Sequence, residues 1–78
     1  GVFALQGREG DGERLIRAAI ARMPNEAELH FELGRSLARQ RKLPEAIAAL
    51  QRAVQLAPGD ARYAFTLEAL RAGRGATR

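Results

Sequence analysis

The chain has 78 residues, no cysteine and a formal net charge of +4 at pH 7. This length allows one small domain, and without cysteine neither a disulfide framework nor a thiolate metal site can stabilise it. Up to Glu68 the ten basic and nine acidic residues nearly balance, so the excess positive charge lies in the C-terminal arginines and nucleic acid is not expected as a partner.

The first part of the chain predicts two helices separated by a turn. A short helix is expected near residues 2–6, and the glycines at positions 7, 10 and 12 predict a flexible connection after it. A second helix is expected near residues 11–23, because apolar residues recur there with the three-and-four spacing of one helix face. This apolar row consists of Leu15, Ile16, Ala19, Ile20 and Met23.

Three further helices are expected near residues 27–40, 44–57 and 61–72. Pro44 suits the first turn of a helix, Pro58 stands where a helix cannot continue, and Asp60 can cap the helix that follows. Residues 73–78 contain only small or basic side chains apart from Thr77, and they predict a frayed tail. The short connections between these helices predict antiparallel neighbours.

The sequence also overlays itself when it is shifted by 34 residues. A fixed period of this length is typical of a solenoid built from repeated helical hairpins. The match preserves both size and polarity along the chain, for example at Ile16 and Leu50, Ala19 and Ala53, Pro24 and Pro58, Phe31 and Phe65, and Leu33 and Leu67.

Residues 27–60 resemble one complete tetratricopeptide repeat. Leu33-Gly34 and Leu37 resemble the pattern of its first helix, and the second helix is represented by Ala46, Leu50, Ala53 and Pro58. Residues 1–26 resemble part of a preceding repeat, 61–72 resemble a capping helix, and 73–78 form the tail. The resemblance implies an all-α fold, an α-α superhelix of antiparallel helix hairpins in a single domain over residues 1–78.

Four positions depart from the family pattern. Gly12 and Glu13 stand where the family prefers alanine and an aliphatic residue. Glu68 replaces the glycine of the first helix, and Arg71 replaces its large apolar residue. Polar substitutions in a final helix are typical of a solvent-facing cap.

No catalytic, cofactor-binding or metal-binding residue is predicted, and the chain is not expected to be an enzyme. The glycines at 7, 10 and 12 lack the spacing of a dinucleotide fingerprint. His30 is the only histidine and has no cysteine to join it at a metal, so a structural or surface role is expected. Ser36 is six residues from His30 on the same helix, which does not bring the two side chains together as a catalytic pair.

The resemblance implies a concave groove that binds a peptide or a partner protein. The groove positions correspond to Glu28, Phe31, Arg35, Ala38, Arg39, Arg62, Phe65 and Ala69. The aromatic and arginine residues favour an acidic or aromatic peptide. Glu28 and Glu32 are candidate internal partners for Arg35 and Arg39. The alternative is that the arginines are merely solvated and the phenylalanines pack between helices.

The expected function is therefore that of an adaptor or scaffold for protein–protein interaction. Self-association within a larger protein is an alternative, and an RNA-binding helical repeat is a weaker one. No membrane association is expected, because the longest apolar run, 46–50, is far shorter than the ~20 residues of a spanning helix. The compartment, cytoplasmic or periplasmic, stays open. Twelve arginines to one lysine favour a bacterial source, and the start without methionine suggests a piece of a larger protein.

Overall fold

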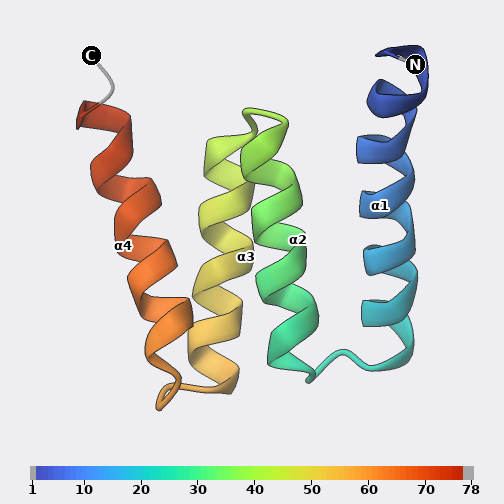
Figure 1. Ribbon diagram of the computed structural model, residues 1–78. Helices are drawn as coiled ribbons and strands as arrows, with labels where there is room; N and C mark the ends of the chain where they lie inside the picture. The colour runs from blue at the N-terminus through green and yellow to red at the C-terminus, as the bar shows by residue number, and fades with distance from the viewer. Residues whose placement is uncertain (1, 77–78) are drawn as a thin grey trace.

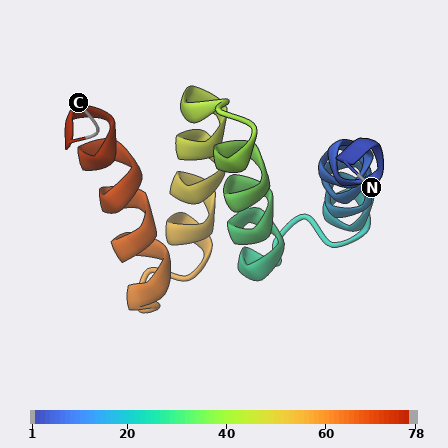
Figure 2. The same ribbon diagram turned by 45° about the horizontal axis from the view of Figure 1, so that its top comes forward.

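The computed structural model describes the backbone of residues 2–76 and the side chains of residues 12–72. Four helices occupy this part of the chain: α1 (Val2–Arg22), α2 (Ala27–Arg39), α3 (Leu43–Leu56) and α4 (Ala61–Ala76). Successive helices run in opposite directions, α2 and α3 lie in the middle, and α1 and α4 flank them (Figure 1). A tilted view shows the same order (Figure 2). The residues described contain no strand, and the predicted all-α arrangement of helix hairpins is confirmed.

The boundaries of α2 and α3 confirm the sequence prediction within one residue. Pro44 lies in the first turn of α3, where its missing N–H is not needed. Asp60 caps α4, because its Oδ1 accepts a hydrogen bond of 2.9 Å from the backbone N–H of Arg62. Pro44 and Asp60 therefore mark the starts of α3 and α4, as the sequence predicted.

The predicted turn at Gly7, Gly10 and Gly12 is wrong, because α1 is continuous from Val2 to Arg22. The predicted helices near 2–6 and 11–23 are one helix. Glycine lowers the stability of a helix by about 1 kcal/mol relative to alanine, but it does not forbid helical dihedral angles. Proline would have broken the helix, and this segment contains none.

The predicted start of the tail at residue 73 is also wrong, because α4 continues to Ala76. Gly73 and Gly75 lie within the helix and do not terminate it, for the reason that applies to α1. Residues 77 and 78 of the predicted tail lie outside the described residues.

The core consists of two clusters on either side of the α2–α3 hairpin. One joins α2, α3 and α4 through Phe31, Leu50, Ala53, Tyr63 and Leu67. The other joins α2 and α3 to α1, where Ile16 and Ile20 pack against Leu33, Leu37, Ala46 and Ala49. The predicted packing residues Ala46, Leu50 and Ala53 are completely buried.

Gly34 determines how closely α2 and α3 approach each other. A Cβ atom at this position would lie 2.7 Å from Cγ of Leu50 and 3.2 Å from the carbonyl oxygen of Ala46. The first distance is too short for a Cβ atom and the second is tight, so a side chain at this position would force α2 and α3 to shift apart.

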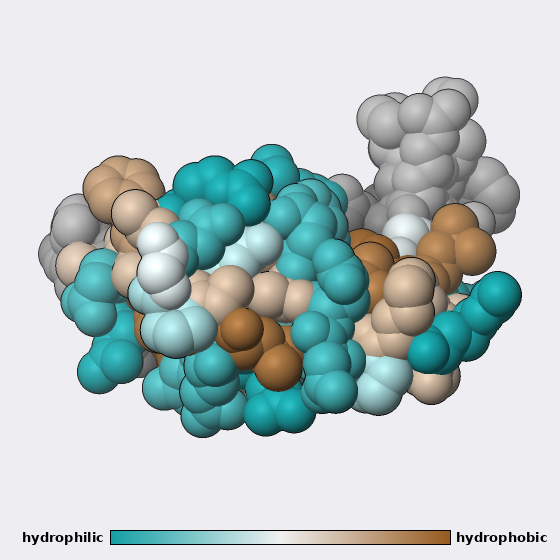
Figure 3. Space-filling model, turned by 90° about the horizontal axis from the view of Figure 1, so that it is seen from below, coloured by the Kyte–Doolittle hydropathy of each residue, from teal (hydrophilic) through white to brown (hydrophobic). Residues whose placement is uncertain are grey.

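The surface is uneven in polarity. Viewed from below, the part formed by α2, α3 and α4 is mostly hydrophilic, and hydrophobic surface gathers beside α1 (Figure 3). Among residues 12–72, the large exposed apolar side chains are those of Leu15 in α1, Met23 just after α1 and Phe65 in α4. No helix within residues 2–76 combines the length and the apolar character needed to cross a membrane.

Candidate binding site

The helices α2 and α4 meet through an aromatic pair. The ring centroids of Phe31 and Tyr63 are 5.0 Å apart and the rings are inclined by 44°, a favourable geometry for two aromatic side chains. Both side chains are buried. Phe31, a predicted groove residue, therefore packs between helices, as the alternative reading of the sequence proposed.

Glu28 and Tyr63 connect the same two helices by a hydrogen bond. The Tyr63 hydroxyl donates to Oε1 of Glu28 at 2.8 Å. Burial raises the pKa of Tyr63, and the hydrogen bond to Glu28 raises it further. Tyr63 therefore keeps its proton at neutral pH and remains the donor to the carboxylate.

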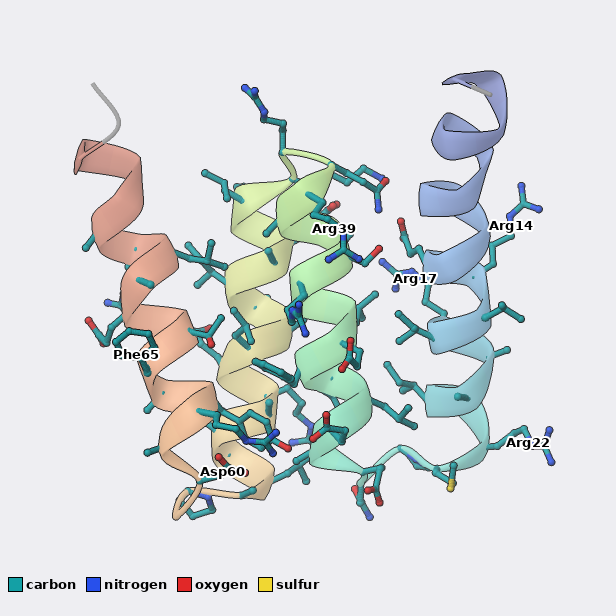
Figure 4. The ribbon with its side chains drawn as sticks, viewed as in Figure 1. Arg14, Arg17, Arg22, Arg39, Asp60 and Phe65 are labelled. Carbon is teal, nitrogen blue, oxygen red and sulfur yellow. The ribbon has the colours of Figure 1, made fainter. Side chains whose placement is uncertain are left out.

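Arg62 is held by carboxylates on two sides. Its guanidinium lies 2.9 Å from Oδ2 of Asp60 and 3.2 Å from Oε1 of Glu28. The hydrogen bonds from Arg62 lower the pKa of Asp60, and Asp60 in turn raises the pKa of Arg62. Asp60 thus caps α4 and also orients Arg62 toward α2 (Figure 4 labels Asp60 at the start of α4).

Two guanidinium groups, one from each helix, flank the Phe31 ring. Cζ of Arg35 is 5.6 Å from the ring centroid and Cζ of Arg62 is 5.8 Å from it. Arg62 also lies over the Tyr63 ring at 5.1 Å. All three distances fall within the range of cation–π attraction. We call Phe31, Arg35, Arg62 and Tyr63 the arginine–aromatic cluster.

The ion pair of Arg35 is longer than those of Arg62. Its side chain is 51% exposed, and its ion pair with Glu32 is long, at 4.0 Å. Glu28, which the sequence offers as another partner for Arg35, pairs with Arg62 and Tyr63 instead. The structure thus brings together four of the predicted groove residues, Glu28, Phe31, Arg35 and Arg62.

The other predicted groove residues lie elsewhere. Ala38 is half-buried against the core cluster beside α1. Arg39 is exposed one turn beyond Arg35, on the side of α2 that faces α1 (Figure 4). Phe65 and Ala69 are exposed, and Phe65 points away from α3 (Figure 4). They do not join the cluster, because α4 directs Tyr63 and Leu67 into the core and residue 65, midway between them, lies on the opposite face.

The sequence did not predict the roles of two residues that link helices, Tyr63 and Glu13. Tyr63 is the only tyrosine, but its apolar counterpart in the 34-residue overlay is Leu29, which suggested nothing beyond packing. At Glu13 the sequence shows only a departure from the family pattern. Its side chain, 16% exposed, accepts hydrogen bonds from Gln40 at 2.9 Å and Arg17 at 2.8 Å, and lies 3.8 Å from Nζ of Lys42.

Glu13 therefore ties α1 to the turn between α2 and α3. The hydrogen bond from Gln40 is the main cause of the lowered pKa of Glu13, followed by the hydrogen bond from Arg17. A buried aliphatic residue at this position would make no such directional contact. The departure from the family pattern thus has a structural role between helices.

His30 and Ser36 also have structural roles. The carbonyl oxygen of Pro24 lies 2.8 Å from Nε2 of His30, so this nitrogen carries a proton and donates it. The bond holds the turn between α1 and α2. Ser36 is buried, and Nε2 of Gln40 lies 3.4 Å from its hydroxyl. Among the described residues, no three acidic or histidine side chains gather as a metal site.

Comparison with known proteins agrees with the all-α helix-hairpin fold. A family model described as tetratricopeptide repeat matches residues 6–61, which is more than half of the chain. A comparison with curated proteins gave no match, and neither did a comparison with solved structures. Repeats of this family generally mediate protein–protein interaction and are generally not enzymes. The helix hairpins, the close contact at Gly34 and this match together show that the chain belongs to the tetratricopeptide repeat family.

Proposed function

We propose that the chain binds an acidic, aromatic-containing peptide segment of a partner protein at the arginine–aromatic cluster. The observation that carries the proposal is that Arg35 of α2 and Arg62 of α4 flank one ring, Phe31. A guanidinium group presents parallel N–H donors to a carboxylate and a flat face to an aromatic ring, so two of them suit both features of such a peptide.

The two arginines have different roles in this proposal. Arg62 is oriented in advance by Asp60 and Glu28, so little freedom is lost when a ligand contacts it. Among the described residues, Arg35 has Glu32 as its only carboxylate partner. This exposed pair is worth at most about 1 kcal/mol and exchanges readily for an incoming carboxylate. Arg39, one turn further along α2, would extend the contact toward α1.

The acidic neighbours limit the strength of binding. Glu28, Glu32 and Asp60 formally balance Arg35, Arg39 and Arg62, so long-range attraction is small and recognition depends on short-range pairing. We expect moderate affinity that falls as the salt concentration rises, because exposed charge pairs are screened.

The test is a peptide-array screen followed by fluorescence anisotropy with the wild type and the variant Arg35→Glu plus Arg39→Glu. Both side chains are exposed, so the fold should survive, and circular dichroism checks this. We expect the affinity for acidic aromatic peptides to fall by tenfold or more, because repulsion replaces two attractive contacts.

Arg52→Glu serves as the matched control. Arg52 is exposed on α3, and among the described residues its side chain hydrogen-bonds only to Gln55. This single change also makes the chain more acidic, so it measures the nonspecific effect of charge. A double variant that retains every peptide bound by the wild type would contradict the proposed site.

A further inference from the structure

We propose that the outer face of α4 is a self-association surface, where two copies of the chain pair α4 with α4 in an antiparallel, two-fold arrangement. This free face of α4 consists of Ala61, Phe65, Glu68, Ala69 and Ala72, all of them exposed. Phe65, 76% exposed, lies opposite the core side of the helix (Figure 4).

Comparison with the equivalent residue of the preceding repeat shows that Phe65 lacks a covering side chain. Phe31 stands 34 residues earlier in the equivalent position and is only 8% exposed, because Tyr63 of α4 packs against it. Exposing a large aromatic side chain is unfavourable, and the loss is recovered when another surface covers it. The outer face of α4 is therefore suited to a partner.

The partner cannot dock on α4 in the way that α3 docks on α2. At Gly34 the lack of a side chain lets Leu50 approach closely. The equivalent residue on α4 is Glu68, whose side chain excludes a second helix with a large apolar residue at that point. The occupant must instead offer small residues and a positive charge.

A second copy of α4 offers both. Glu68 and Arg71 carry opposite charges, lie three residues apart on the same flank of the helix, and form no ion pair within the described part of the chain. In a two-fold pair, if Glu68 of one copy contacts Arg71 of the other, the reverse contact forms as well. The surface is thus complementary in charge to itself.

The same arrangement accommodates the apolar residues. When each Glu68 lies beside Arg71 of the other copy, Ala69 falls close to the two-fold axis and Phe65 lies against Ala72 of the other copy. Alanine at the crossing point allows the helices to approach to the ~8 Å of a close helix pair. Each Phe65 then loses its contact with water.

The pairing is expected to be weak. One helix face against another buries less than the ~1,200 Å² of typical stable interfaces, so the dimer should depend on concentration. The proposal is independent of peptide binding, because Arg62 turns toward α2 and the free face of α4 turns away from it.

Sedimentation equilibrium of the 78-residue chain from about 10 μM to about 1 mM tests the proposal by mass action. We expect the average mass to rise toward that of two copies. Phe65→Glu should remain monomeric at every concentration, and circular dichroism should show it folded, because the side chain is exposed in the monomer. Leu15→Glu, which changes a similarly exposed apolar residue on α1, should associate like the wild type.

Charge reversal tests the antiparallel register. Glu68→Arg should weaken association at least tenfold, because arginines then face each other across the pair. Adding Arg71→Glu should restore it, since the complementary order is only reversed. A merely structural effect of Glu68→Arg would not be rescued in this way.

Cross-linking tests the position of the axis. The chain has no cysteine, so Ala69→Cys introduces a single thiol. We expect oxidation to link two copies efficiently, because disulfides form only when the Cα atoms lie about 4.4–6.8 Å apart. Ala48→Cys, at an exposed alanine of α3, should cross-link slowly. A wild type that stays monomeric, or a dimer that survives Phe65→Glu or is lost in Leu15→Glu, would overturn the proposal.

Discussion

At the scale of single residues, Arg41 determines how α2 ends. Its φ of 68° is the one positive value outside glycine among residues 2–76. The conformation lets the N–H groups of Arg41 and Lys42 bond to the carbonyl groups of Ala38 and Leu37 at 3.0 and 2.9 Å. Glycine adopts this conformation without the steric penalty of a Cβ atom, so Arg41→Gly should raise the free energy of unfolding by about 0.5–1 kcal/mol in urea titrations.

Arg41→Ala separates the backbone effect from the loss of the side chain. Alanine keeps the Cβ penalty, so this variant should not gain stability. If Arg41→Gly were no more stable than Arg41→Ala, the backbone at this position would not be strained, and the turn would owe its form to other contacts.

At the scale of elements, two helical glycines have opposite roles. Gly34→Ala should destabilise the chain by about 1–3 kcal/mol, because the added Cβ would meet Leu50 and the backbone of Ala46 and force α2 and α3 apart. Gly12→Ala adds a Cβ with nothing within 4 Å. It should stabilise α1 by up to about 1 kcal/mol, because alanine favours the helix. Thermal melts followed by circular dichroism measure both changes.

This pair of variants also tests the continuity of α1. If Gly12 belonged to a turn with positive φ, Gly12→Ala would destabilise the chain. The measured sign therefore distinguishes the continuous helix from the turn that the sequence predicted.

At the scale of the whole molecule, Glu13 makes the stability of the contact between α1 and the α2–α3 turn depend on pH. Its pKa is lower in the folded chain, so the native state binds fewer protons than the unfolded state, and the stabilisation is present above the ordinary pKa of a glutamate. This stabilisation disappears as the pH falls from the ordinary glutamate pKa of 4.5 through the lower pKa of the folded chain. We expect Glu13→Gln to be less stable than the wild type at pH 7. The two should be equally stable at a pH low enough to protonate Glu13 in both the folded and the unfolded wild-type chain.

Denaturant titrations between about pH 7 and pH 3 measure this difference. Glu26→Gln is the control, because Glu26 is exposed and makes no capping hydrogen bond with its side chain. It should stay within about 0.5 kcal/mol of the wild type. A constant gap between Glu13→Gln and the wild type across the range would mean that contacts other than the carboxylate charge hold α1.

Much of the fold follows from local patterns in the sequence. The bounds of α3 were predicted within one residue and the start of α4 was predicted correctly, because Pro44, Pro58 and Asp60 mark helix ends through local geometry and capping. The close contact at Gly34 was also predictable, since a residue without a side chain lets two helix backbones approach closely. The continuity of α1 and the C-terminal end of α4 were not predicted, because glycine weakens a helix without forbidding it.

The sequence by itself determined that the chain is a helical repeat, since periodicity and the 34-residue overlay are properties of the chain alone. Only the tertiary structure decided which side of each helix is covered. Phe31 and Phe65 occupy equivalent positions, yet one is buried and the other exposed, because α4 packs beside α2 whereas Phe65 points away from its neighbours. Likewise Glu28 pairs with Tyr63, 35 residues away, instead of with the arginines on its own helix. Burial and pairing depend on what lies across the interface, and a local pattern does not contain that information.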